Sequence, residues 1–138
     1  CDRMFLAMMC NAYDEEGVGE ETRVVLRLPA ILAPIKVAVL PLIKKDGLPE
    51  KAMEIFNTLK FNHQCYYEEK DSIGKRYRRM DAIGTPYCIT VDHQTLEDNT
   101  VTIRERDSMQ QERIAIADVL QIVNAKVDIN TVLKQLAD

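Results

Sequence analysis

Between residues 35 and 106, short apolar runs alternate with amphipathic segments, and this order constrains the fold more than any other feature of the chain. Strands are predicted at Ile35–Leu40, Gln64–Glu68, Tyr87–Val91 and Thr100–Arg106. Apolar residues recur at helical spacing in Glu50–Lys60 and from Ser72 to about Ile83, which predicts two helices between the first three strands. Strands joined by helices of this length are typical of parallel pairing.

The remaining segments complete a small α/β domain. The fourth strand follows the third through turn-forming residues at Asp98–Asn99, so it is predicted to be antiparallel to it. Further helices are predicted at Met109–Val123 and Ile129–Leu136. We therefore expect a mixed, mostly parallel sheet of about four to five strands, covered by about three helices. A stray N-terminal helix at Asp2–Tyr13 precedes it, and the acidic segment Asp14–Thr22 is expected to be mobile.

Bulk composition restricts the classes of protein that are possible. The chain has 138 residues, of which 46% are apolar and 29% are charged, as in ordinary globular proteins. No apolar run is long enough to cross a bilayer, so a membrane partner is not expected and the cytoplasm is the default location. The chain begins with Cys1 rather than Met, which indicates a piece of a longer polypeptide.

Several common catalytic and metal-binding patterns are missing from the sequence. The four cysteines form no C-x-x-C pair and have no histidine at zinc-like spacing, so no metal site is predicted. Gly74–Lys75 lacks the preceding glycine of a phosphate-binding P-loop. His63 and His93 lie beside no nucleophile and are expected to be ordinary edge or turn residues. A complete active site is therefore not expected within residues 30–138.

A basic segment in the second predicted helix is the strongest functional signal. Four cations occupy five positions of a chain whose net charge is −4: Lys75, Arg76, Arg78 and Arg79. Local positive charge in an acidic protein favours a specific anionic partner, and phosphate contacts of a nucleic acid fit this pattern. The alternative is a solvated helix face that happens to carry several arginines.

Planar side chains that could read bases lie around the fourth predicted strand. Arg104 and Arg106 are the main candidates and Glu97 is a weaker one, because guanidinium and carboxylate groups can bond to the edges of unstacked bases. The same residues are equally typical of cross-paired charges on an edge strand, and this alternative stays open.

Four segments in order resemble the C-terminal anticodon-binding domain of class II aminoacyl-tRNA synthetases. They are Ala33–Leu42, Gly74–Arg78, Asp81–Tyr87 and Val101–Asp107, and the resemblance covers the chain from about Pro34 to its end. Within this group the junction at residues 23–34 is similar to that of glycyl-tRNA synthetases. The resemblance implies an anticodon-binding domain at 34–138 that contacts the tRNA backbone through the four cations and reads anticodon bases through Arg104, Arg106 and Glu97.

The start of the chain resembles the end of catalytic motif 3 of the same enzymes. The matching residues are Cys1, Asp2 and Arg3, and the resemblance implies that Arg3 belongs to an ATP-binding motif. Residues 1–16 would then be a remnant of the catalytic domain, and residues 17–33 a linker. Motifs 1 and 2 and the glycine-rich strand of motif 3 are missing from this sequence, so this piece alone is expected to be inactive.

The resemblance also implies what the full-length protein would do. It would attach glycine to its tRNA using ATP and Mg²⁺, as a homodimer, while this segment holds no cofactor and grips the anticodon stem-loop of glycine tRNA. Three alternatives stay open: a noncatalytic nucleic-acid-binding accessory protein with the same domain, the corresponding domain of a threonyl- or prolyl-tRNA synthetase, and a domain whose basic helix binds an acidic protein.

Overall fold

The computed structural model describes residues 1–19, 21–130 and 133–134, and its centre is a five-stranded sheet in the order β4-β3-β5-β6-β7. The strands are β3 (Val37–Pro41), β4 (Cys65–Tyr67), β5 (Tyr87–Val91), β6 (Thr100–Glu105) and β7 (Gln111–Ala115). β3 pairs in parallel with β4 and β5, whereas β6 is antiparallel to both β5 and β7. The predicted mixed α/β fold is confirmed, with an even division between parallel and antiparallel pairs.

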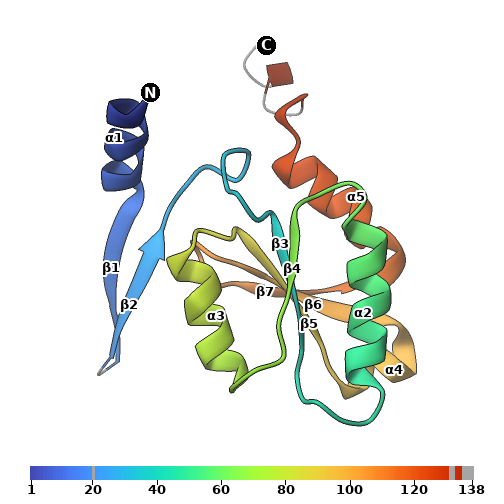
Figure 1. Ribbon diagram of the computed structural model, residues 1–138. Helices are drawn as coiled ribbons and strands as arrows, with labels where there is room; N and C mark the ends of the chain where they lie inside the picture. The colour runs from blue at the N-terminus through green and yellow to red at the C-terminus, as the bar shows by residue number, and fades with distance from the viewer. Residues whose placement is uncertain (20, 131–132, 135–138) are drawn as a thin grey trace.

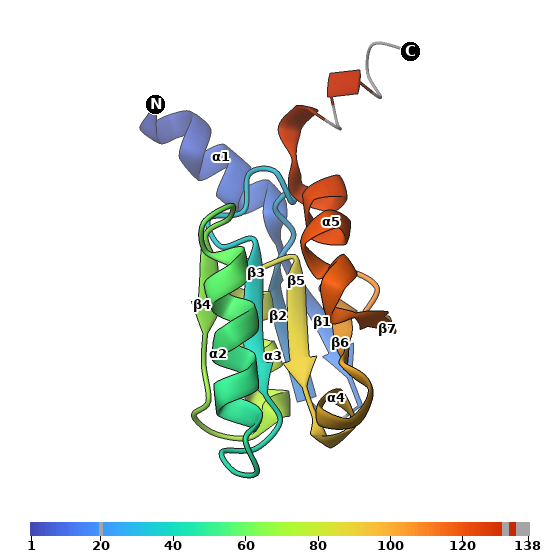
Figure 2. The ribbon, with the colours of Figure 1, turned by 90° about the vertical axis from the view of Figure 1, so that its right-hand side faces the viewer.

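Helices cover the two faces of this sheet unequally. α2 (Leu48–Leu59) and α5 (Ile116–Val127) pack on one face, and α3 (Ile73–Ala82) lies on the other (Figures 1 and 2). The main core is the layer beneath α2 and α5, where residues such as Leu48, Ile89 and Val101 have no exposed surface. A smaller cluster joins α3 to β3 and β5 through Met80, Leu40 and Cys88. No helix among the described residues is long and apolar enough to span a membrane.

Local sequence signals explain where α3 begins and ends. Ser72 holds the N-cap position, although its side chain makes no capping hydrogen bond. At the other end Gly84 adopts φ +82° and donates to the Asp81 carbonyl, while Thr85 donates to the Met80 carbonyl. This pair of bonds is the Schellman motif, for which glycine is favoured because it has no Cβ. A Cβ at Gly84 would also lie 3.0 Å from the Leu26 carbonyl oxygen, so helix and hairpin meet closely here.

The predicted mobile segment Asp14–Thr22 is instead part of a β-hairpin. The N-terminal helix α1 (Asp2–Ala12) leads into β1 (Tyr13–Val18), which pairs antiparallel with β2 (Glu21–Leu26). The acidic residues that suggested mobility have basic partners across this hairpin: Arg27 forms ion pairs with Asp14 and Glu16. β1 crosses the expected boundary between residues 16 and 17, while the three-part division of the chain stays a prediction.

The predicted helix at Met109–Val123 is wrong over its first half. Residues 111–115 form β7, and α5 begins only at Ile116. Met109 has φ +57°, a left-handed conformation that ends a regular helix, and the following residues bond to β6 as an edge strand. The turn predicted around His93 is also wrong, because His93 begins the short helix α4 (His93–Asp98). The helix predicted at Ile129–Leu136 lies partly outside the described residues.

A buried ionic cluster fastens the hairpin to the sheet and to α3. Asp81, only 1% exposed, accepts from Arg23 Nε of β2 at 2.8 Å and from both terminal nitrogens of Arg104 on β6 at 2.9 and 3.1 Å. Arg23 also donates to the Arg106 carbonyl and, at 2.7 Å, to Glu16. Three separate elements therefore meet at one carboxylate, which makes the hairpin an integral part of the domain.

Candidate nucleic-acid interface

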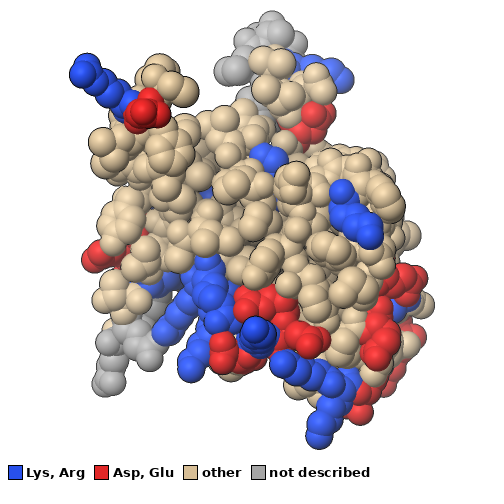
Figure 3. All heavy atoms as spheres, viewed as in Figure 1, with Lys and Arg blue, Asp and Glu red and all other residues tan. Residues whose placement is uncertain are grey.

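Exposed cations gather where the carboxyl ends of β3 and β4 meet the start of α3. Parallel strands place their carboxyl ends at one edge of a sheet, so the residues following β3 and β4 are brought together there. Figure 3 shows Lys and Arg concentrated in this lower part of the molecule, mixed with Asp and Glu. We call this set the basic rim: Lys44, Lys45, Lys70, Lys75, Arg78 and Arg79, all of them exposed.

The outward face of α3 carries the cations that the sequence predicted to contact phosphate. Lys75, Arg78 and Arg79 are exposed, as their spacing of three and four residues along a helix requires. Arg79 is paired within the protein: its guanidinium lies 2.7 Å from Glu68 and 2.8 Å from Asp71. The hydrogen bond from Arg79, together with the nearby charges of Lys75 and Lys44, lowers the pKa of Asp71.

Arg76 lies on the opposite, inward face of α3. It is 2% exposed and donates through Nη1 to the carbonyls of Pro41 at 2.6 Å and Glu68 at 3.2 Å, and through Nη2 to that of Leu42 at 3.1 Å. Burial lowers the pKa of this guanidinium. Arg76 therefore ties the ends of β3 and β4 to α3, and its side chain is not on the surface that the other three cations share.

Arg104 and Arg106, predicted to read bases, are also buried. Arg104 bonds to Asp81 and packs over the Tyr77 ring, with its guanidinium carbon 4.7 Å from the ring centroid. Arg106 donates to the carbonyls of Gly84 at 2.9 Å and Leu28 at 2.8 Å, and to Asp107. Their hydrogen-bonding groups are directed into the protein, which favours a structural role. Glu97 is exposed on α4.

The residues that resemble the end of an ATP-binding motif lie together at an exposed helix start, and their part in binding ATP stays a prediction. Cys1, Asp2 and Arg3 are exposed at the start of α1, which extends away from the sheet (Figure 1). Three neighbouring side chains on one exposed helix do not enclose a nucleotide, because ligand sites bury most of their ligand in a concave surface. Within the described ranges, no group of three or more His, Cys, Asp or Glu side chains is arranged to hold a metal ion.

The sheet surface beside α3 is polar and contains a pocket of about 250 Å³. Because Thr102 pairs with Thr90 on one side and with Arg113 on the other, these three side chains form one row across β5, β6 and β7. The pocket lies between this row and α3, and its lining combines apolar and polar side chains with one carboxylate: Leu42, Ile73, Tyr77, Thr90, Asp92, Thr102 and Gln111. Uncharged donors and acceptors are thus available beside the basic rim.

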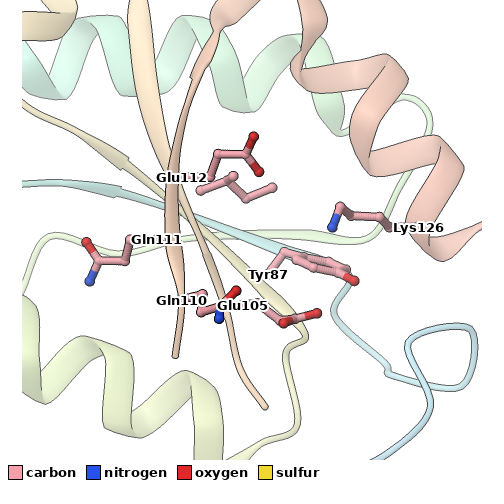
Figure 4. A pocket seen from close by; sticks show the side chains of 7 residues that line it. Tyr87, Glu105, Gln110, Gln111, Glu112 and Lys126 are labelled. Atoms are coloured by element: carbon pink, nitrogen blue, oxygen red, sulfur yellow. The ribbon is translucent and has the colours of Figure 1, made fainter. Parts of the chain in front are cut away.

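A second pocket, of about 320 Å³, opens on the α5 side of the sheet (Figure 4). Its lining includes Glu105 and Glu112, and Lys126 of α5 lies with its ammonium 5.2 Å from the centroid of the Tyr87 ring. Two carboxylates repel the phosphates of a nucleic acid, so this pocket is the weaker candidate for an RNA-binding site.

Lys44, Lys45, Lys70 and the polar sheet pocket were not predicted from the sequence. The position of the lysines could have been predicted, because each of them follows a correctly predicted parallel strand. The carboxyl ends of parallel strands lie at one edge of the sheet, where the next helix begins. The pocket had no such signal, because Gln111 of β7, which lines it, was predicted to lie in a helix.

Arg113 and Asp92 provide a test of the electrostatics beside this pocket. Arg113 donates to both carboxylate oxygens of Asp92 at 2.7 and 2.9 Å, and this holds the pKa of Asp92 at about 2, below its usual 3.8. Because the folded-state pKa is depressed, the stabilisation is present above pH 3.8 and is lost as the pH falls towards 2. The Asp92→Asn variant should lower the free energy of unfolding by about 1–2 kcal/mol at pH 7.

Urea unfolding between pH 7 and pH 2 measures this difference. The gap between the parent and Asp92→Asn should close as the pH approaches 2, whereas the exposed Asp118→Asn control on α5 should differ little from the parent at any pH. A gap that stays constant down to pH 2 would show that the charge of Asp92 does not contribute.

Comparison with known proteins agrees with this geometry. The family model described as "Anticodon binding domain" matches residues 36–126. The chain is 48% identical over 135 residues to a glycine–tRNA ligase of Rhodopirellula baltica, covering 94% of the chain and 25% of that relative. It is 56% identical over 127 residues to the glycine–tRNA ligase of Alkaliphilus oremlandii, covering 91% of the chain and 27% of the relative. The glycine–tRNA ligase of Malacoplasma penetrans is 60% identical over 119 residues, 86% of the chain and 25% of the relative.

The chain therefore spans about a quarter of the length of the curated relatives it matches. The matched residues 36–126 contain every strand of the five-stranded sheet together with α2, α3 and α4, and they leave out the β1–β2 hairpin. The chain belongs to the anticodon binding domain family, in the form that glycine–tRNA ligases carry.

Proposed function

We propose that this chain binds the anticodon arm of a glycine tRNA as part of a longer glycine–tRNA ligase. The observation that carries the proposal is the basic rim on a chain of net charge −4. Lysine and arginine side chains that contact phosphates supply most of the affinity for a nucleic acid without reading its sequence. The similarity to glycine–tRNA ligases supports glycine tRNA as the partner.

The full-length protein, in this proposal, joins glycine to that tRNA with ATP and Mg²⁺, acts as a homodimer and works in the cytoplasm. All four cysteines are free thiols, which favours a reducing compartment. Burial raises the pKa of Cys88 to about 12 and that of Cys65 to about 11, so both thiols stay protonated and unreactive at neutral pH. The described residues support a role in binding, with the chemistry supplied by the remainder of the enzyme.

A binding titration of the 138-residue chain tests the central claim. Glycine tRNA and a variant with a substituted anticodon should both bind at low salt, with the unmodified anticodon favoured. Equal affinity for the two would reduce the claim to a general tRNA-contacting surface. Absence of binding to either RNA would overturn the proposed function.

The Lys75→Ala variant should weaken binding to all tRNAs by a similar factor, because a phosphate contact carries no sequence information. The slope of log K against log salt concentration should become shallower by about one unit, because one fewer phosphate is neutralised. Titrations at several salt concentrations measure the slope. Lys60→Ala is the matched control, because Lys60 is also exposed but lies at the C-cap of α2, away from the basic rim. Identical slopes for the two variants would remove Lys75 from the interface.

A further inference from the structure

The sheet face beneath α5 changes from apolar to acidic at one end of β6 and β7. Along β6, Val101 and Ile103 belong to the main core, and Glu105 is the next residue on the same face because side chains alternate along a strand. Glu112 of β7 lies directly opposite Ile103, so it shares this face. Two carboxylates therefore follow the apolar core, at the end of the strands that the last turn of α5 reaches through Lys126.

The pocket of about 320 Å³ on the α5 side opens at this point (Figure 4). Its charged lining consists of Glu105, Glu112 and Lys126, so negative charge exceeds positive charge. The neutral lining residues are Tyr87, Ile103, Gln110 and Gln111. The volume lies at the lower end of the roughly 300–1,000 Å³ of small-molecule sites, which favours a small ligand over a segment of another protein.

Tyr87 supplies evidence of a ligand that is independent of the carboxylates. This residue is only 8% exposed, yet its hydroxyl makes no hydrogen bond with any described residue. Burial raises the pKa of Tyr87, and the nearby carboxylate of Glu105 raises it further, so the hydroxyl stays neutral at physiological pH. Because nearly all buried polar groups have a partner, an unpaired hydroxyl that lines a pocket is available to a ligand.

The two carboxylates also have unused hydrogen-bonding capacity. Glu112 is exposed and forms neither an ion pair nor a hydrogen bond within the described part of the chain. Glu105 accepts one hydrogen bond, from the Ser108 hydroxyl, which leaves most of its acceptor capacity free. Lys126 pairs with neither carboxylate, and its ammonium lies 5.2 Å from the centroid of the Tyr87 ring. Figure 4 shows Lys126 pointing towards Tyr87, with Glu105 beside the ring.

We propose that this pocket binds a small aliphatic amine, with ammonium groups on Glu105 and Glu112 and the carbon chain against Ile103 and the Tyr87 ring. The two glutamates are diagonal neighbours on paired strands, a separation of about 7–8 Å, so a linear diamine can place one ammonium on each. The ammonium beside Glu105 can also donate to the Tyr87 hydroxyl, because these two residues are paired across β5 and β6. Amine binding goes beyond the proposed function and does not require RNA.

The position of Lys126 predicts the sign of one effect. Its ammonium already occupies the aromatic ring of Tyr87 and repels a second cation. Lys126→Met removes the charge and keeps most of the stem, so it should tighten amine binding about threefold. Lys60→Met is the matched control and should leave the affinity unchanged. Lys60 also lies over an aromatic ring, 5.4 Å from the centroid of Phe61, but at the end of α2 and outside this pocket.

Isothermal titration calorimetry of the 138-residue chain with putrescine, a four-carbon diamine, tests the site at low salt. The uncharged four-carbon diol is the control ligand and should not bind. Glu112→Gln should weaken putrescine binding about two- to fivefold, as the loss of an exposed ion pair does. Glu50→Gln is the matched control, because Glu50 is exposed and has no ion pair among the described residues, but lies beside β4 at the opposite edge of the sheet.

Tyr87→Phe tests the buried hydroxyl separately. It should weaken putrescine binding about tenfold, because a hydrogen bond to a charged donor is lost. The free energy of unfolding should stay the same, because the hydroxyl has no partner within the described structure. Urea unfolding checks this.

Several results would overturn the proposal. Equal weakening by Glu112→Gln and Glu50→Gln would show that putrescine is only a diffuse counterion of an acidic protein. Weaker binding in Lys126→Met, or equal binding by the parent and Tyr87→Phe, would place the amine outside this pocket. Failure of the parent chain to bind putrescine would also overturn it. The proposed function is tested by RNA binding and is not affected by these outcomes.

Discussion

The Asp81→Asn variant is expected to lose about 3–5 kcal/mol of unfolding free energy, the usual consequence of removing one partner of a buried ion pair. Asp81 accepts hydrogen bonds from Arg23 and Arg104, and both of these side chains are themselves buried. Asparagine has nearly the same shape but carries no charge and offers only one acceptor oxygen. Arg104 has no other carboxylate partner in the described structure, so its charge would stay buried and uncompensated.

Urea unfolding of the 138-residue chain measures this loss, with Asp71→Asn as the matched control. Asp71 is also an aspartate bonded to an arginine, at 2.8 Å from Arg79, but both partners are exposed. An exposed pair contributes about 0–1 kcal/mol. If the two variants lose the same small amount, the buried cluster does not hold the domain together.

The same substitution should also change the hairpin locally. Arg23 lies on β2, and its bond to Asp81 is one of the contacts that join the hairpin to α3 and β6. Hydrogen exchange of the β2 amides should therefore become faster in Asp81→Asn than in Asp71→Asn, relative to amides of β5 in the core. Equal protection of β2 in both variants would show that the cluster does not anchor the hairpin.

Sequence patterns predicted the elements whose signals are local. β3, α2, β4, α3, β5 and β6 all lie within a few residues of their predicted ranges, because each has its own apolar periodicity and its own turn or cap residues. β7 was missed because its sequence, three polar residues followed by Ile114 and Ala115, has no alternating pattern and also fits the start of a helix. The hairpin was missed because its acidic residues are paired with arginines farther along the chain.

Whether an arginine is buried or exposed depends on tertiary structure, and the sequence predicted this only in part. Arg76 lies three residues after Ile73 and four before Met80, both of which face the sheet, so helical phase already placed it inward. The partner of Arg104 is 23 residues away, and Arg106 bonds mainly to backbone carbonyls, which no side-chain pattern reveals. A cation in a basic segment is therefore weak evidence of an RNA contact until its direction in the fold is known.

The Arg76→Met variant should lose about 3 kcal/mol of unfolding free energy, because an unsatisfied buried acceptor costs about 1–3 kcal/mol and several are left at once. Methionine fills much of the space of the arginine stem but donates no hydrogen bonds, so the carbonyls of Pro41 and Leu42 lose their Arg76 donors. Glu68 loses a third, longer bond. Urea unfolding measures the loss, and Lys75→Ala, one residue earlier on the outward face of α3, should change stability by less than about 0.5 kcal/mol.

RNA binding under conditions where both variants are folded should separate the two residues further. Lys75→Ala is expected to make the salt dependence shallower by about one unit, as the removal of one phosphate-binding cation does. Arg76→Met should instead leave that slope unchanged and lower the affinity a few-fold, because Arg76 fixes the chain that leads from Pro41 and Leu42 to Lys44. The opposite pattern, with unchanged stability and a slope shallower by about one unit in Arg76→Met, would show that Arg76 turns outward to bind phosphate. The inward conformation of Arg76, bonded to the carbonyls of Pro41 and Leu42, would then not be the conformation that binds RNA.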